Sequence, residues 1–109
     1  MIEAKINDAL KVLCNGRVSP LVAKQGTQSP YICYTKISEV YSDVMCGQSY
    51  VEYCFQIDVY AKTLFESENV IKEVYAKLKP LKPFNVNIHH DHESDTGLYR
   101  STIEFFLLN

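Results

Sequence analysis

The chain has 109 residues, of which 47% are hydrophobic and 22% are charged, and its formal net charge is −2. These values are typical of one globular domain and exclude a disordered chain or a strongly basic nucleic-acid-binding protein. There is no apolar run of about 18 residues, so we expect no transmembrane helix. The first residues lack the basic-then-apolar order of a signal peptide, which predicts synthesis in the cytoplasm.

Residues 2–14 predict an amphipathic helix, because apolar residues recur there at spacings of three and four. These apolar residues are Ile2, Ile6, Ala9, Leu10 and Leu13. The pair Asn15-Gly16 predicts the end of this helix, since glycine readily adopts a left-handed conformation. Residues 17–24 contain a proline and predict at best an edge strand, and residues 25–30 have the composition of a loop.

Residues 49–61 alternate between apolar and polar side chains, which predicts a long strand in the middle of an antiparallel sheet. One side of this strand carries Val51, Tyr53, Phe55, Ile57 and Val59. Residues 31–44 predict a second long strand with a bend or bulge in its second half. Residues 44–48 then predict the turn that joins the two strands into a hairpin, with Gly47 as its pivot.

Thr63 is the predicted N-cap of a second helix, and Glu66 follows at the spacing of a capping box. This helix is expected to run to about Lys79, because Pro80 and Pro83 prevent its continuation. Its predicted apolar face consists of Phe65, Val70, Ile71, Val74, Tyr75 and Leu78.

Residues 84–88 predict a strand, residues 89–97 a polar turn, and residues 98–108 a closing strand. The last part of the closing strand is apolar on both faces, so it is either covered on both sides or forms a contact with a neighbouring subunit. The predicted fold is therefore α+β: residues 1–109 form a single domain with a four- to five-stranded, mostly antiparallel sheet and two helices packed on one face.

The sequence contains little that could support catalysis, and we expect neither an enzyme nor a cofactor. No serine or cysteine lies in the motif of a nucleophile, and there is no glycine-rich phosphate loop. The four cysteines, Cys14, Cys33, Cys46 and Cys54, contain no C-x-x-C pair and are expected to be reduced thiols.

The histidine cluster is the one candidate for a metal site. On a strand, His90 and His92 would share a face, with Asp91 and Glu93 opposite. Two histidines could begin a zinc or nickel site, but they need further ligands that are missing locally. We therefore expect a solvated hairpin without a metal.

The aromatic residues allow two interpretations. The eight tyrosines and five phenylalanines are expected mostly in the core, but tyrosines on the sheet could instead form contacts with other proteins. The tyrosines considered for such contacts are Tyr31, Tyr34, Tyr50 and Tyr60. Binding of single-stranded nucleic acid is less favoured, because lysine and arginine are sparse.

The order of these segments resembles the small tail-terminator, or tail-completion, proteins of long-tailed bacteriophages and prophages. The likeness spans nearly the whole chain and rests on weak motifs that occur in the same order. They are Asn-Gly-Arg-Val-Ser-Pro at 15–20, the strand at 29–38, the alternating strand at 55–61, the helix at 69–78 and the apolar last strand at 99–108.

The resemblance implies a structural protein of the virion, made in the bacterial cytoplasm. Such a protein is a ring subunit, commonly in a hexamer, which caps the head-proximal end of the tail tube and joins it to the head connector. Its partners would be further copies, the tube protein and the connector or head-completion protein, with DNA as passing cargo and no membrane. A tail-tube or head-closure subunit, or a bacterial protein-binding module, is the alternative.

Three sets of contact residues are expected under this resemblance. The loops that touch the tube or connector would use Gln25, Gln28, Tyr41, Ser42, Asp43, Met45 and Gln48. The second hairpin, with His90, Asp91, His92, Glu93 and Asp95, would face a partner or an acidic lumen that repels DNA. Ring contacts at the sheet edges would use Tyr31, Tyr34, Phe106 and Leu108.

Overall fold

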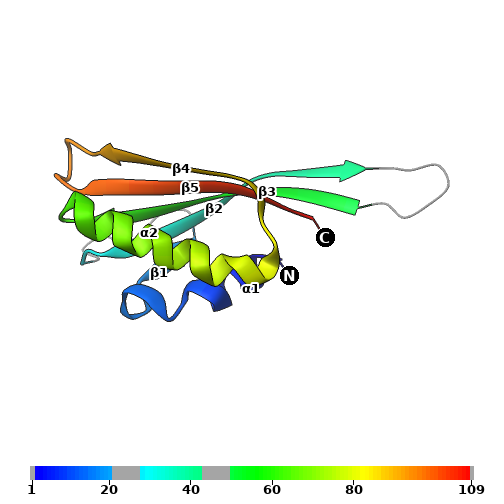
Figure 1. Cartoon of the computed structure of the whole chain (residues 1–109), viewed down its shortest axis with the longest axis horizontal. Helices are drawn as coiled ribbons and strands as arrows, with labels where there is room; N and C mark the ends of the chain where they lie inside the picture. Colours follow the sequence, from blue (N-terminus) through cyan, green and yellow to red (C-terminus); the bar gives the residue numbers. More distant parts are fainter. Residues whose placement is uncertain (1, 21–27, 43–49, 109) are drawn as a thin grey trace.

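The computed structural model describes residues 2–20, 28–42 and 50–108, which fold into one mixed sheet with two helices (Figure 1). The helices are α1 (Ile2–Leu10) and α2 (Leu64–Leu78), each followed by a 3₁₀ turn, η1 (Leu13–Gly16) and η2 (Lys79–Leu81). The strands are β1 (Val18–Pro20), β2 (Tyr31–Ser42), β3 (Tyr50–Ala61), β4 (Phe84–His92) and β5 (Tyr99–Leu108). The predicted α+β class is confirmed.

The five strands lie in the order β1-β2-β3-β5-β4, with β3 in the middle, as its alternation predicted. All neighbouring pairs are antiparallel except β1 with β2, where a three-residue strand runs parallel along the outer edge. The predicted irregularity in β2 is a register shift between Lys36 and Ser38, which leaves Ile37 as an extra residue.

The two helices cover one face of the sheet, which we call the covered face; the other is the open face (Figure 1). The covered face carries the fully buried Phe55 and Phe105, whose rings stack with centroids 5.9 Å apart. It also receives Ile6 and Leu10 of α1. The core therefore lies between the sheet and the helices. It joins the apolar side of the alternating strands to the apolar stripe of each helix.

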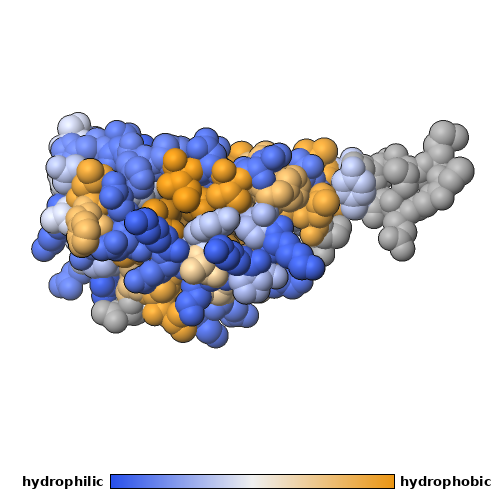
Figure 2. All heavy atoms as spheres, in the orientation of Figure 1, coloured by the Kyte–Doolittle hydropathy of each residue, from blue (hydrophilic) through white to orange (hydrophobic). Residues whose placement is uncertain are grey.

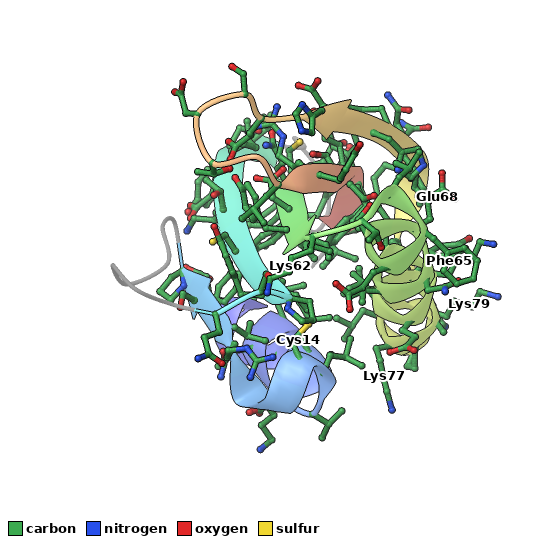
Figure 3. The ribbon with its side chains drawn as sticks, turned by 90° about the vertical axis from the view of Figure 1, so that its left-hand side faces the viewer. Cys14, Lys62, Phe65, Glu68, Lys77 and Lys79 are labelled. Carbon is green, nitrogen blue, oxygen red and sulfur yellow. The ribbon has the colours of Figure 1, made fainter. Side chains whose placement is uncertain are left out.

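The first helix is shorter than the predicted span of 2–14, since α1 ends at Leu10. Cys14, with φ of 52°, and Gly16, with φ of 80°, adopt left-handed conformations that cannot continue an α-helix. Leu13 still reaches the core, but from the 3₁₀ turn. Figure 3 shows Cys14 beside this turn on the inner side of the molecule.

Thr63 caps α2 as predicted: its side-chain oxygen accepts a hydrogen bond from the backbone N–H of Glu66 at 3.1 Å. The prediction that Phe65 belongs to the apolar face is wrong, because its side chain is 75% exposed. The buried stripe begins at Ser67, and a residue two positions away lies about 200° around the helix axis. Phe65 and Lys79 accordingly lie on the outer side of α2 in Figure 3.

The fourth strand differs from the prediction in two ways. It continues to His92, so residues 89–92 are strand and not turn. A register shift between Phe84 and Asn87, with φ of 52° at Asn85, moves Phe84 to the open face, where its ring stacks on Phe106. Val86 remains on the covered face, packed against the core.

Candidate functional site

The far ends of β2 and β3 form an arm, which we define as residues 37–42 and 50–53. At its base, Glu52 and Tyr53 still pair with Leu108 and Leu107 of β5. Beyond the Glu52–Leu108 pair, β3 has no partner other than β2 in the described part of the sheet. The arm projects past the helices along the long axis of the molecule, which measures 52 Å against 23 and 22 Å in the other directions (Figure 1). On β2 the residues Ile37, Glu39, Val40 and Tyr41 of the arm are exposed, whereas Tyr53 at its base packs against the core.

Large apolar side chains are exposed along this arm. Ile37 and Val40 are each 52% exposed, Tyr50 is 44% exposed and Tyr41 is 69% exposed. The pairing places Val40 and Tyr50 on the open face and Tyr41 on the covered face. An exposed apolar group of this kind is typical of a contact with another protein.

The base of the arm is linked to α1 by charged side chains. Lys36 Nζ donates to Glu3 Oε2 at 3.1 Å and also to Glu39, and the Tyr41 hydroxyl donates to Glu39 at 2.9 Å. The hydrogen bonds of Glu39 and then Glu3 raise the pKa of Lys36, and the hydrogen bond from Lys36 lowers the pKa of Glu39. Lys36, Glu39 and Glu3 therefore remain ionised at neutral pH.

The link borders a pocket of about 320 Å³ between the first turn of α1 and the arm. The pocket is lined by Ile2, Glu3, Lys5, Lys36, Glu39, Tyr41 and Tyr53. Lys36 also lies over the ring of Tyr53, 5.9 Å from its centroid.

The opposite end of the molecule brings together two segments that the sequence analysis assigned to different contacts. Gln28 and Ser29, before β2, line a pocket of about 410 Å³ together with Thr96 and Leu98 of the β4–β5 turn. Gln28 therefore lies far from Tyr41, at the other end of the long axis (Figure 1). Of the other predicted contact residues, Gln25, Asp43, Met45, Gln48 and the Ser42 side chain lie outside the described residues.

The β4–β5 turn is held by its own hydrogen bonds. The N–H of Glu93 donates to the carbonyl of Leu98 at 2.8 Å, and the N–H of Gly97 donates to the carbonyl of Glu93 at 2.9 Å. Gly97 adopts φ of 71°, which other residues adopt only with strain.

The acidic residues predicted for a DNA-repelling lumen are largely paired. Arg100 lies 3.0 Å from Asp91 and 3.8 Å from Glu93, and Asp95 is the exposed acid that has no ion pair among the described residues. Their combined field is therefore weaker than three unpaired carboxylates would give.

The histidine cluster lies in β4, where His90 and His92 share the covered face. His90 Nδ1 lies 2.7 Å from Ser101 Oγ, and the His92 ring contacts Tyr99. Ser101 in turn donates to Ser67, but both hydroxyls are fully buried and out of reach of a substrate. Within 2–20, 28–42 and 50–108, no three potential ligands converge on a metal position.

The open face carries a polar cluster that the sequence analysis missed. Asp58 is buried there and accepts hydrogen bonds from Thr102 at 2.6 Å and from Gln56 at 3.1 Å. Burial and then the charge of Asp58 raise the pKa of Tyr60, whose ring stacks on Tyr31 at 4.8 Å. Strand alternation placed Gln56 and Asp58 on one face, but it could not show that Asp58 would accept hydrogen bonds from Gln56 and Thr102.

The predicted ring-contact residues are distributed differently from the expectation. Tyr34 is only 9% exposed, since it lies in the core and its hydroxyl points to Asn7. Phe106 and Leu108 belong to β5, which is an inner strand and not an edge. Tyr31 is half-buried, and Leu108 is exposed on the open face near the arm.

The open edges of the sheet are instead β4 and the part of β2 after Tyr34, where the pairing with β1 ends. Among the described residues, β4 pairs with β5 alone, and β2 has no outer partner after Tyr34. Figure 2 shows apolar surface between α2 and β4. In β4, Val86 is partly buried and Ile88 is exposed. Open edges of this length can pair with another chain.

Comparison with known proteins identifies the fold and no family. No family model matches the chain, and no curated protein matches it. Thirty-four chains of solved structures resemble it in fold. One of these aligns over 99% of this chain and 90% of its own length, with a TM-score of 0.54 and 15% identity, and its name states no activity. Neither of the described helices is long and apolar enough to cross a membrane.

Proposed function

We propose that this chain is a structural subunit of a bacteriophage or prophage tail. In this proposal its copies form a ring, commonly a hexamer, that caps the head-proximal end of the tail tube, stops its polymerisation and joins it to the head connector. The observation that supports it most is the projecting arm, with its exposed apolar side chains on both faces.

Beyond the Glu52–Leu108 pair the arm is two-stranded in the described part of the sheet, and a two-stranded ribbon is marginally stable in water unless something packs on it. The arm nevertheless carries Ile37, Val40 and Tyr41 into solvent, where their exposure has no benefit for a lone copy. A neighbouring copy or a tube subunit that covers the arm would bury this surface. The open edge of β4 offers such a neighbour a second place to attach.

The two ends of the long axis suit two different partners. The arm forms one end, and the pocket at Gln28, Ser29 and Thr96 forms the other. A terminator must contact the tube on one side and the connector on the other, which corresponds to this arrangement. This assignment replaces the earlier grouping of the Gln28 loop with the arm tip.

The alternatives are a tail-tube or head-closure subunit and a bacterial protein-binding module. A tube subunit would stack into long tubes, whereas a terminator would stop at one ring. A binding module would use the same arm to hold a different protein and would not close into a ring with its own copies.

Light scattering over a concentration series, with negative-stain microscopy of the same samples, tests the proposal. We expect closed rings of one size, or monomers that join the ends of added tail tubes. Long tubes would favour the tube subunit. A monomer that tail tubes do not recruit would contradict a role in the tail.

A further inference from the structure

We infer that Lys36 is a positioning residue, which fastens the arm to the body of the molecule by bridging Glu3 of α1 and Glu39 of the arm. This deepens the proposed function, because it names the side chain that prepares the arm for its partner. The contact does not depend on the presence of a ring, so it can be tested separately.

The register shift in β2 makes the bridge possible. In a regular strand, residues three positions apart point to opposite faces. The extra residue Ile37 cancels one alternation, so that Lys36 pairs with Phe55 and Glu39 pairs with Tyr53, both on the covered face. The bulge therefore brings the lysine and the glutamate to the same side, below the first turn of α1.

The bridge spans the bulge at the base of the arm, near the end of β5. Lys36 lies before the bulge, level with the packed core, and Glu39 lies after it. Glu3 is 33 positions away in sequence and belongs to a helix that packs on the core through Ile2 and Ile6. Tyr41 extends the connection by its hydrogen bond to Glu39.

The pocket of about 320 Å³ beside the bridge indicates why a tie is needed. It separates α1 from the arm, so apolar packing does not fill this junction. Charged side chains cross the space instead. Without Lys36, the strands beyond the bulge would retain their own ladder and the pairing of β3 with the end of β5 as far as Leu108, and we expect them to open more often.

Hydrogen exchange on the full chain, at a concentration where light scattering shows monomers, tests the inference. In low salt, Lys36→Met should raise exchange of the arm amides 38–42 and 50–53 about threefold, relative to amides 55–59 in the core. Lys36→Arg should stay close to wild type. Sodium chloride at about 0.5 M should bring the wild type towards Lys36→Met, because salt screens exposed ion pairs.

Two further variants make the result specific. Glu3→Gln removes the bridge from the α1 side and should also increase exchange in the arm, which a purely local Lys36–Glu39 contact would not explain. Lys11→Met removes another lysine that pairs three positions away, with Asp8, and should leave the arm unchanged. Equal exchange of the arm in wild type, Lys36→Met and Glu3→Gln would overturn the inference. Absence of rings in light scattering would count against the proposed function alone.

Discussion

Each end of this molecule is a pair of antiparallel strands, but the two ends differ in how far their side chains are paired within the chain. The β4–β5 turn satisfies itself: Arg100 pairs with Asp91 and Glu93, and the backbone of Glu93 bonds to Gly97 and Leu98. The arm instead exposes Val40, Tyr41 and Tyr50. The turn end makes most of its polar contacts within a single copy, although Arg100 Nε is buried without a hydrogen-bond partner in the described part of the chain. The arm has apolar surface that a partner would bury.

This difference separates changes that affect folding from those that affect assembly. At the turn end and in the neighbouring polar cluster, a substitution removes contacts within the chain and should lower the free energy of unfolding. At the exposed positions of the arm, such as Val40, a substitution removes little packing and should leave that free energy nearly unchanged. A substitution at the turn end should therefore be detected by unfolding, and a substitution at the arm by assembly.

The largest effect is expected for Val40→Asp in the arm. Burial of a valine-sized side chain stabilises a contact by about 1.5–3 kcal/mol, and a charge in its place adds a desolvation penalty. We expect the concentration for half-assembly to rise about a hundredfold or more. Light scattering measures this, and the urea midpoint should stay close to wild type.

Two variants accompany this change. Val40→Thr keeps a β-branched side chain and should weaken assembly less, so that an effect of strand propensity can be separated from loss of apolar contact. Val12→Asp is the matched control, because Val12 is an exposed valine of the body, at 64% against 52% for Val40. Equal loss of assembly in both aspartate variants would contradict a special role of the arm.

The next effect is expected for Thr102→Val in the polar cluster. Thr102 is buried and donates to Asp58 at 2.6 Å, so valine leaves a buried carboxylate with one hydrogen bond fewer. Loss of such a charge-assisted bond should reduce the free energy of unfolding by about 2 kcal/mol. Urea unfolding measures the loss, and Thr35→Val, a half-buried threonine on the same face, should cost much less. A Thr102→Val protein as stable as wild type would show that the cluster adds nothing to folding.

The sequence predicted the features that depend on neighbouring residues. The period of two along β3, the cap at Thr63 and the irregularity in β2 are local signals, and the structure contains each of them. The failures lie where one backbone angle or a distant contact decides. A single left-handed residue, Asn85, moves Phe84 to the other face, and the alternation of the sequence cannot predict that shift.

The candidate surfaces were less predictable than the fold. Lys36 and Glu3 are far apart in sequence, so nothing local announced their contact. The length of the arm depends on where the helices stop covering the sheet, which is a tertiary property. Tyr34 and Tyr41 both lie in β2, yet Tyr34 is in the core and Tyr41 is in solvent, because the helices cover only the first of them.

The smallest effect is expected for Gly97→Ala in the β4–β5 turn. A Cβ at this position meets nothing within 4 Å, so the substitution introduces backbone strain without a steric clash. With φ of 71°, alanine should cost about 1 kcal/mol of unfolding free energy, whereas Gly97→Asn should cost less, because asparagine tolerates the left-handed region. Urea midpoints of the three proteins measure this order. Ring assembly of the chain alone should be unchanged in both variants, because the proposal assigns the turn end to the tube or connector and not to another copy. A ring that fails with Gly97→Ala while the chain stays folded would show that the turn, like the arm, contacts another copy.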